Sequence, residues 1–392
     1  MHEDFGKKIV IYGAGFEAER FLCHRKDEFD VEFYIDRIAN RTFHGKQVYA
    51  IEEVPEDIQH KKILVATSEA GYYEISKILD GKGLIEYQDY MSIYDYGKKL
   101  LVLYGNCHMI MISKYLQQQI EFIKKYHVKM FYVGEKKAPS ANDLKYCDVF
   151  IGQDIRKDNE LGMPDISSLM EMATKCQKII IPNLYGYNFF WPQVTGRFDN
   201  TDNWHIGDDR MPESDMKNLS YNARGPVKWM IGWHDKYIEA ELEKGTSIDE
   251  IYENCIAGDI FQPENVKKSF LEAIESLIER EKACDIKISD YILENYMDKD
   301  LFYDPGHPTN ILIREFVRRI LNKLNFNDSE FDYCEFRLDS SEIFIYGCVR
   351  KALGIKYDKK YLKHFETRGT LWNRPISVKE YIKQYKLWFE NK

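Results

Sequence analysis

The sequence predicts an α/β protein with two doubly wound domains, and three observations support this fold class. Apolar, β-branched segments alternate with helix-like segments over residues 8–95, which is the pattern of a parallel sheet covered by helices. After residue 97 the same alternation starts again with a new buried strand. The chain of 392 residues is also longer than a single hydrophobic core usually becomes. We therefore expect a small domain over residues 1–96 and a larger one over residues 97–392.

The composition indicates a cytoplasmic protein whose main partner is not nucleic acid. The formal net charge is -9, whereas a nucleic-acid-binding surface is basic. The first residues lack the basic start and apolar run of a secretory signal. The sequence contains no stretch of 18 uninterrupted apolar residues, so we expect no transmembrane segment. Eight cysteines without a CxxC pair predict reduced thiols rather than disulfides or a metal site.

The first domain contains the spacing of a nucleotide site. A β-branched run from Ile9 to Ile11 predicts a strand that leads into Gly13 and Gly15. The next strand ends in Asp36, about 20 residues further on, where dinucleotide-binding folds hold a ribose hydroxyl with a carboxylate. A third strand at residues 61–68 completes a Rossmann-like pattern. The candidate binding residues of this domain are therefore Gly13, Gly15 and Asp36.

The same turn carries a feature that opposes tight binding of NAD. Glu17 and Glu19 place negative charge at the helix start, where a pyrophosphate would contact free backbone amides. Two interpretations stay open: the glycines bind a nucleotide or nucleotide-linked sugar, or they only permit a tight strand-to-helix turn. The domain resembles the sugar-nucleotide-binding N-terminal domains attached to bacterial glycan-modifying enzymes, and this resemblance implies a nucleotide-sugar ligand.

The second domain begins with the buried strand LLVLYG, residues 100–105, which runs into a long amphipathic helix. Further buried strands at 128–134, 147–153 and 178–184 are separated by helix-like segments. In such sheets the functional crevice lies beyond the carboxyl ends of the strands. The residues at those ends are Gly105, Asn106, Cys107, Gly152, Gln153 and Asn183.

A cysteine at the first strand-to-helix corner is a candidate nucleophile. The amides and the dipole at a helix N-terminus stabilise a thiolate, the reactive form of Cys107. Far downstream, the segment DPGHP supplies Asp304 and His307 at the start of another helix. The histidine would transfer the proton, and the aspartate three residues earlier would fix the imidazole tautomer. His108 is a second candidate base, although neighbours at a helix start point in different directions.

Amide donors around the same corner would hold the oxyanion of a tetrahedral intermediate. The candidates are the backbone N–H groups of Cys107 and Gly152 and the side chain of Asn183. Each motif alone has a structural explanation, because a buried cysteine is usually a small core residue and DPGHP can simply start a helix. The combination of a cysteine at the first corner with Asp-x-x-His at the last favours acyl transfer.

This layout resembles the SGNH hydrolase fold, with cysteine in place of the serine nucleophile. Over residues 98–324, the combination of GNC at 105–107 with DPGHP at 304–308 also resembles the WcbI family of capsular polysaccharide biosynthesis proteins. The resemblance implies coenzyme A and acyl transfer, with acetyl-CoA as the donor and a sugar or glycan as the acceptor. We place Gly105, Asn106 and Gln153 among the residues that contact coenzyme A.

A long aromatic-rich insertion, residues 185–245, follows Asn183. It could cover the crevice, with aromatic rings stacking on adenine and basic side chains pairing with phosphates. The basic candidates are Arg197, Arg210, Arg224 and Lys228. The alternative is an ordinary packing excursion. Beyond residue 325 or so lies a C-terminal extension that looks folded but has no recognisable role.

Three functions fit these residues. We expect a coenzyme A-dependent acyltransferase, with acetyl as the acyl group, that modifies a sugar of capsular or other surface polysaccharide and can associate peripherally with the glycan assembly machinery. A thiol esterase or deacylase would use the same residues with water as the acceptor, and only the exclusion of water separates the two. A non-catalytic carbohydrate- or nucleotide-binding protein is the third. The sequence leaves the oligomeric state open.

Overall fold

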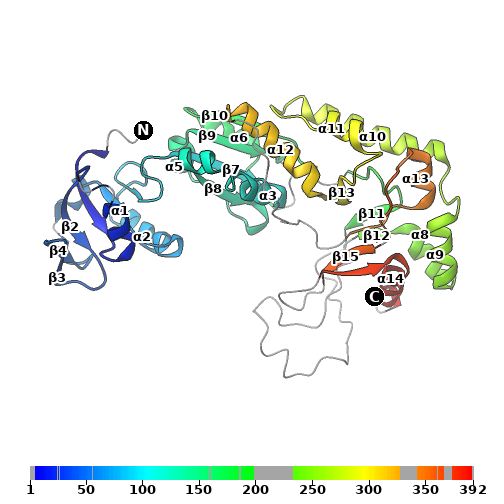
Figure 1. Ribbon diagram of the computed structural model, residues 1–392, viewed down its shortest axis with the longest axis horizontal. Coiled ribbons are helices and arrows are strands. Elements are labelled where there is room, and N and C mark those ends of the chain that lie inside the picture. Colours follow the sequence, from blue (N-terminus) through cyan, green and yellow to red (C-terminus); the bar gives the residue numbers. More distant parts are fainter. Residues whose placement is uncertain are drawn as a thin grey trace, which may run out of the picture. The chain divides into compact units, whose positions relative to one another are not determined.

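Figure 1 shows the computed structural model, whose chain divides into two compact units, Met1–Ile179 and Ile180–Lys392. The predicted boundary at residues 96/97 lies inside the first unit, between its two sheets. None of the helices in the described residues combines the length and apolar composition needed to cross a membrane. The structure describes residues 5–23, 25, 27–54, 56–157, 159, 161–184, 187–197, 233–326, 342–359, 361–365 and 373–390.

The first sheet has six strands in the order β3-β4-β2-β1-β5-β6. Strand β1 lies in the interior of the sheet and pairs in parallel with β2 and β5. Strands β2, β3 and β4, which follow β1 in the chain, lie on one side of it, and the later strands β5 and β6 lie on the other. Helices α1 (Phe16–Cys23) and α2 (Glu69–Gly81) connect strands of this sheet, and Ser68 caps α2 by accepting from the amide of Gly71. The strands are β1 (Lys8–Tyr12), β2 (Asp30–Ile35), β3 (Arg41–Phe43), β4 (Lys46–Tyr49), β5 (Ile63–Val65) and β6 (Tyr90–Ser92), with a 3-10 turn at Glu56–His60.

The second sheet has four strands in the order β10-β9-β7-β8. Strand β7 pairs in parallel with β8 on one side and with β9 on the other, which confirms a second doubly wound α/β domain. Six of the seven residues of β7 are buried, as expected for a strand covered on both faces. The elements are β7 (Lys99–Gly105), α3 (Cys107–Leu116), α4 (Ile120–Lys125), β8 (Tyr126–Tyr132), α5 (Ala141–Tyr146), β9 (Val149–Gln153), α6 (Ile166–Met172) and β10 (Gln177–Ile181), with a 3-10 turn at Val133–Glu135.

A cluster of ionisable groups joins the two sheets of the first unit. The ammonium of Lys129, on β8, lies 3.0 Å from a carboxylate oxygen of Glu86 and 3.3 Å from one of Asp143. The hydroxyl of Tyr72, on α2, donates to the same Glu86 oxygen at 2.6 Å. Burial raises the pKa of the Glu86 carboxyl, and the Lys129 ammonium opposes that rise. Because each charge would be costly there alone, the pairing holds the first sheet against the second.

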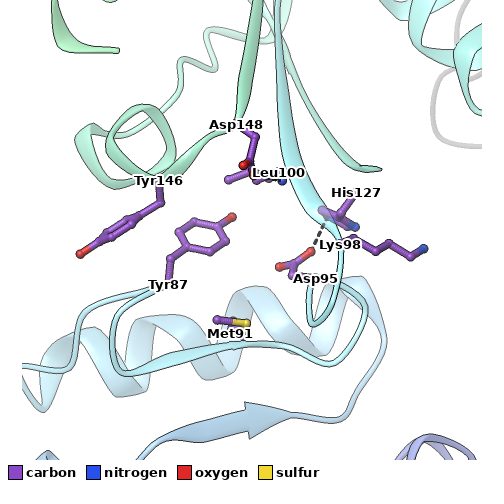
Figure 2. Close-up of a pocket in the computed structure, with 8 residues that line it drawn as sticks. All are labelled: Tyr87, Met91, Asp95, Lys98, Leu100, His127, Tyr146 and Asp148. Carbon is purple, nitrogen blue, oxygen red and sulfur yellow. Dashed lines mark hydrogen bonds and ion pairs between the residues drawn. The ribbon is translucent and has the colours of Figure 1, made fainter. Parts of the chain in front are cut away.

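A second polar contact lies at the same junction, around a cavity of about 10 Å³ (Figure 2). Nε2 of His127, on β8, lies 2.9 Å from Oδ1 of the buried Asp95, and the dashed line in Figure 2 marks this pair. A space of this size holds about one water molecule. It is therefore a packing gap rather than a ligand site. The other lining residues are Tyr87, Met91, Lys98, Leu100, Tyr146 and Asp148.

The second unit is mainly helical, and its described strands form three two-stranded ribbons. Its core is aromatic: Phe189 packs against Phe302 with ring centroids 5.0 Å apart, and the indole of the fully buried Trp191 donates to the carbonyl of Phe344 at 3.1 Å. The elements are β11 (Val194–Arg197), β12 (Trp233–Asp235), α8 (Lys236–Glu243), α9 (Ile248–Ala257), α10 (Pro263–Glu281), α11 (Ser289–Asn295), β13 (Phe302–Asp304), β14 (His307–Pro308), α12 (Asn310–Lys323), α13 (Gly347–Leu353), β15 (Tyr361–Phe365), β16 (Asn373–Ser377) and α14 (Val378–Glu390).

Candidate active site

Cys107 is the first residue of α3 and is partly exposed. The side chain of Asn106 caps this helix by accepting a hydrogen bond from the amide of His108 at 2.9 Å. Gly105 is required where β7 ends, because an added Cβ would lie 2.7 Å from Oε1 and 2.8 Å from Cβ of Gln153. Gly105 and Asn106 therefore each have a local structural reason, and together they place the Cys107 thiol at a helix N-terminus.

Gln153, at the end of β9, is completely buried and connects the two sides of this corner. Its Oε1 accepts from the amide of Asn106 at 2.8 Å, and its Nε2 lies 3.1 Å from Nδ1 of His108. A backbone amide can only donate, so the oxygen of the Gln153 side chain faces Asn106 and the nitrogen faces His108. Nδ1 of His108 must then accept, which makes His108 a neutral ring with its proton on Nε2. The structure thus gives Gln153 a positioning role at this corner.

Gly152 lies inside β9, paired with Tyr104 of β7. An added Cβ would come within 2.0 Å of Cδ1 of Ile166, so close packing of α6 against β9 explains the glycine. Asn183 lies just after β10 and is partly buried. The proposed contacts of Gly152 and Asn183 with an oxyanion stay predictions.

The structure brings Asp304 and His307 together in the short hairpin formed by β13 and β14. Nδ1 of His307 lies 2.8 Å from Oδ2 and 3.0 Å from Oδ1 of Asp304, and the amide of Gly306 donates to Oδ1 at 2.7 Å. Both side chains are buried, with exposed fractions of 9% for His307 and 1% for Asp304. Since a carboxylate only accepts, it holds the proton on Nδ1 and leaves Nε2 as the acceptor nitrogen of the neutral ring.

Residues from the C-terminal extension fix this hairpin in place. The ammonium of Lys359 donates to the carbonyl of Phe302 at 2.8 Å and lies 3.0 Å from Oδ2 of Asp300. The amide of Ile343 donates to the carbonyl of Tyr303 at 3.0 Å. The position of Lys359 is not predictable from the sequence, because one lysine in a segment without a motif gives no signal of where it docks.

Cys107 belongs to the first compact unit, whereas Asn183, Asp304 and His307 belong to the second. Within its own unit, each half of the predicted machinery is assembled: the helix-capped cysteine in one and the aspartate-held histidine in the other. The catalytic pairing of Cys107 with His307 stays a prediction.

The predicted phosphate contacts fall largely outside the described residues. Arg197 is the last residue of β11, and its side chain is not among those described. Arg210, Arg224 and Lys228 also lie outside the described residues. Their contact with coenzyme A stays a prediction.

The nucleotide-type motif of the first domain forms a tight turn. Gly13 has φ of +111°, and an added Cβ would lie 2.3 Å from the carbonyl oxygen of Ala66. The carboxylate of Asp36 accepts from the amides of Ala14 at 2.7 Å and Ile38 at 3.0 Å. These contacts account for Gly13 and Asp36 as turn residues, while an added Cβ at Gly15 would meet no atom within 4 Å. Nucleotide-sugar binding at Gly13, Gly15 and Asp36 stays a prediction.

A groove of about 510 Å³ lies on the second unit, between α8 and the residues that follow α9. Phe261 stacks on the buried Tyr346 with centroids 6.1 Å apart, and Tyr237 meets the same ring edge-on at 5.9 Å. The volume is within the range of small-ligand sites. Polar groups lie beside these rings, and the lining includes Lys236, Glu241, Asn254 and Asp259.

Asp235 lies at the end of β12 and is buried among hydrogen-bonding groups. It caps α8 by accepting from the amides of Tyr237 and Ile238, and Oδ2 also accepts from the hydroxyl of Tyr346 at 2.8 Å. Burial raises the pKa of the Asp235 carboxyl to about 6. Within the described part of the chain, no three His, Cys, Asp or Glu side chains gather as they would around a metal ion.

Comparison with known proteins tests the predicted family. The model of the family described as polysaccharide biosynthesis enzyme WcbI matches residues 100–329, more than half of the chain. A solved structure of WcbI is described as a novel polysaccharide biosynthesis enzyme, in the native form without a disulfide bond between coenzyme A and a cysteine. It is 16% identical, with a TM-score of 0.51, and the match covers 75% of this chain and 91% of that one. At this identity the likeness shows the fold alone.

A pseudomurein peptide ligase type C from Methanothermus fervidus also matches, with 12% identity and a TM-score of 0.22 over 47% of this chain and 45% of that one. That score is too low to carry an argument about the fold. No curated protein sequence matches the chain. The family model confirms the resemblance predicted from GNC and DPGHP, and the chain belongs to the WcbI family of polysaccharide biosynthesis enzymes.

Proposed function

We propose that this protein is a coenzyme A-dependent acyltransferase that acetylates a sugar of capsular or other surface polysaccharide. Its family and the description of the solved WcbI structure, which mentions coenzyme A, support this class of reaction. The observation that carries the proposal is the contact of Nδ1 of His307 with both carboxylate oxygens of Asp304. A histidine held in this way can take a proton at Nε2, as acyl transfer to an alcohol requires.

In the first step, the Cys107 thiolate attacks the carbonyl carbon of the acetyl thioester. The bond between that carbon and the coenzyme A sulfur breaks, and the coenzyme A thiolate leaves with the electron pair. The Cys107 thiol lies at the N-terminus of α3, which the side chain of Asn106 caps. The product of this half-reaction is acetyl-Cys107.

In the second step, Nε2 of His307 removes the proton of a sugar hydroxyl as its oxygen attacks the acetyl carbon. The bond to Cys107 breaks, which releases the sugar ester and regenerates the thiolate. Asp304 stabilises the imidazolium that forms and keeps the ring oriented. A thiol esterase would follow the same steps with water in place of the sugar, so the choice between the two depends on how well water is excluded.

The groove beside α8 supports a saccharide acceptor. The rings of Tyr237 and Phe261 lie beside amide and carboxylate groups, including Asn254 and Asp259, which can bind the faces and hydroxyls of a sugar. A polysaccharide is long enough for one sugar to be anchored while another reacts, and such remote contacts contribute to turnover. Substitution of Asp259 by Asn should therefore raise KM for a glycan acceptor and leave KM for acetyl-CoA unchanged.

The test of the function is incubation with radiolabelled acetyl-CoA, followed by denaturation and measurement of the label on the protein. Wild type is compared with Cys107→Ala and His307→Ala, and Cys23→Ala is the matched control because Cys23 is an exposed cysteine on α1. We expect label on wild type, on the Cys23 variant and on His307→Ala, but none on Cys107→Ala.

Addition of a capsular oligosaccharide should then discharge the label from wild type and leave it on His307→Ala. If all variants bind coenzyme A equally and none retains label, transfer without an acyl-cysteine replaces this mechanism. Discharge to free acetate at the same rate with and without the oligosaccharide would identify an esterase. If no variant binds coenzyme A, the acyltransferase proposal loses its donor.

A further inference from the structure

Two cysteines outside the proposed active site lie side by side at the start of neighbouring strands. Cys147 directly precedes Asp148 and β9, and Cys176 directly precedes β10, which is adjacent to β9 in the sheet. The amide of Gln177 donates to the carbonyl of Asp148 at 2.9 Å and so brings the two segments together. The side chains of Cys147 and Cys176 interact with each other. This pair is therefore a candidate for a disulfide.

The environments of the two sulfur atoms differ in a way that gives them different roles. Cys176 is partly exposed, whereas Cys147 is 1% exposed and its thiol donates to the carbonyl of Leu144 at 3.3 Å. The interaction with Cys147, with the charge of Lys178 and the amide of Phe150, lowers the pKa of the Cys176 thiol. The interaction with Cys176 and burial raise the pKa of the Cys147 thiol.

We propose that Cys176 and Cys147 form a thiol–disulfide exchange site whose substrates are low-molecular-weight disulfides. Cys176, as the accessible thiolate, attacks one sulfur of a disulfide RSSR, which forms a mixed disulfide and releases one thiolate RS⁻. Cys147 then loses its proton and attacks the Cys176 sulfur, which forms the Cys147–Cys176 bond and releases the second RS⁻. In total, two protein thiols are oxidised to one disulfide, and one RSSR is reduced to two RSH.

The site is separate from the residues of acyl transfer. Cys147 and Cys176 lie at the start of β9 and β10, whereas Gln153 lies at the end of β9 and Asn183 lies beyond the end of β10. The new bond would link two strands that already pair, so it would lock the edge of the sheet without moving the Cys107 corner. The exchange reaction therefore does not depend on the proposed function, and either can fail alone.

The test uses the full-length reduced protein, incubated with oxidised glutathione and quenched with acid. Non-reducing digestion and mass spectrometry then show which cysteines are linked. The variants are Cys147→Ser and Cys176→Ser, and the exposed Cys23 within the same chain is an internal reference for a thiol in solvent. Detection of the Cys147–Cys176 link in the wild-type protein requires no variant. This measurement therefore tests the proposal even if a substitution prevents folding.

We expect wild type to yield the peptide pair joined through Cys147 and Cys176, while Cys23 carries only glutathione. In Cys147→Ser the reaction should stop at glutathione on Cys176, and Cys176→Ser should leave Cys147 unmodified. Cys176 should also react at least tenfold faster than Cys23 near neutral pH. Stable glutathione on wild-type Cys176 without the cross-link, or reaction of Cys176 no faster than Cys23, would overturn the proposal.

Discussion

The backbone amide of Asn106 donates a hydrogen bond to Oε1 of Gln153 at 2.8 Å. This contact orients the Gln153 amide and thereby sets the proton of His108 on Nε2. The buried side chain of Gln153, at the end of β9, thus bonds both to Asn106 and to His108, the residues before and after Cys107. The corner is rigid because both neighbours of Cys107 are bonded to this one side chain.

We predict that Gln153→Glu changes the tautomer of His108 and lowers activity about fivefold, since a hydrogen bond is worth about 1 kcal/mol. A carboxylate still accepts from Asn106 but cannot donate to Nδ1, so the ring must carry a proton there. Nitrogen chemical shifts of the imidazole, recorded by NMR, report the change directly. A wild-type ring already protonated at Nδ1 would contradict the assignment.

Asp304→Asn should lower kcat for acyl transfer by about 10³ to 10⁴, as loss of the orienting carboxylate does in catalytic triads. The amide of Gly306 keeps the asparagine oxygen on its side, so the NH₂ group faces Nδ1 of His307. That group donates to Nδ1, the imidazole proton moves to Nε2, and Nε2 can no longer accept the proton of the hydroxyl. Steady-state kinetics measure the loss, and an unchanged circular dichroism spectrum is the control. Activity close to wild type would remove His307 from the mechanism.

Gly152→Ala should destabilise the protein by about 1 to 3 kcal/mol, because overpacking forces neighbouring side chains to move. The added methyl group would meet Cδ1 of Ile166 at 2.0 Å. Adding Ile166→Ala to the same chain makes room and should recover part of the loss. Urea unfolding of the two single variants and the double variant measures this coupling. Strict additivity would show that the two side chains do not compete for this space.

Lys129→Met should destabilise the first unit by about 3 kcal/mol, because it leaves the Glu86 and Asp143 carboxylates close together without a counter-charge. The double variant that adds Glu86→Gln removes one of these charges and should recover part of the stability. Hydrogen exchange of β8 and of the segment around Glu86 follows the effect locally. Equal protection in wild type and Lys129→Met would show that the cluster does not hold the sheets together.

Asp235→Asn should change how stability depends on pH. The pKa of Asp235 is raised to about 6 in the folded protein. Between the ordinary pKa of Asp235 in the unfolded chain and its folded pKa of about 6, the folded state therefore binds more protons than the unfolded state. The stabilisation from Asp235 is complete below its unfolded pKa and is lost as pH rises through about 6.

Relative to wild type, Asp235→Asn should gain about 3 kcal/mol between about pH 4 and about pH 7, from 1.36 kcal/mol per unit of pKa shift. The asparagine oxygen can still accept from the amides of Tyr237 and Ile238, so the cap of α8 is kept. Unfolding by urea across this range gives the difference. Parallel pH profiles of the two proteins would show that Asp235 stays ionised in the fold.

The two sheets, the cysteine turn and the Asp304–His307 contact were predictable because each is indicated by residues close together in the sequence. The run into Gly105, Asn106 and Cys107 fixes a strand, a turn and a capped helix within a few residues, and Asp304 reaches His307 across a short hairpin. The role of Gln153 was only partly predictable, because its two partners are set by the pairing of β7 with β9. A position at a strand end indicates a functional crevice but does not say whether the side chain faces a ligand or the protein interior.

The contact of Lys359 with Phe302 could not be predicted, since 57 residues separate the two and no periodicity connects them. The same holds for the thiol pair, because Cys147 and Cys176 precede different strands and share no sequence motif. In both cases the contact depends on the order in which distant segments pack, which is a tertiary property.

The docking of Ile343 and Lys359 on β13 also has a consequence during synthesis on the ribosome. The hairpin that carries Asp304 and His307 leaves the exit tunnel before these supports do. A nascent chain therefore holds every proposed catalytic residue while β13, the strand that carries Asp304, is still unsupported. Translation that stalls between His307 and Ile343 would therefore release a chain with a complete set of reactive groups but a loosely held base. The late supports thus delay full catalytic competence until the hairpin has been locked.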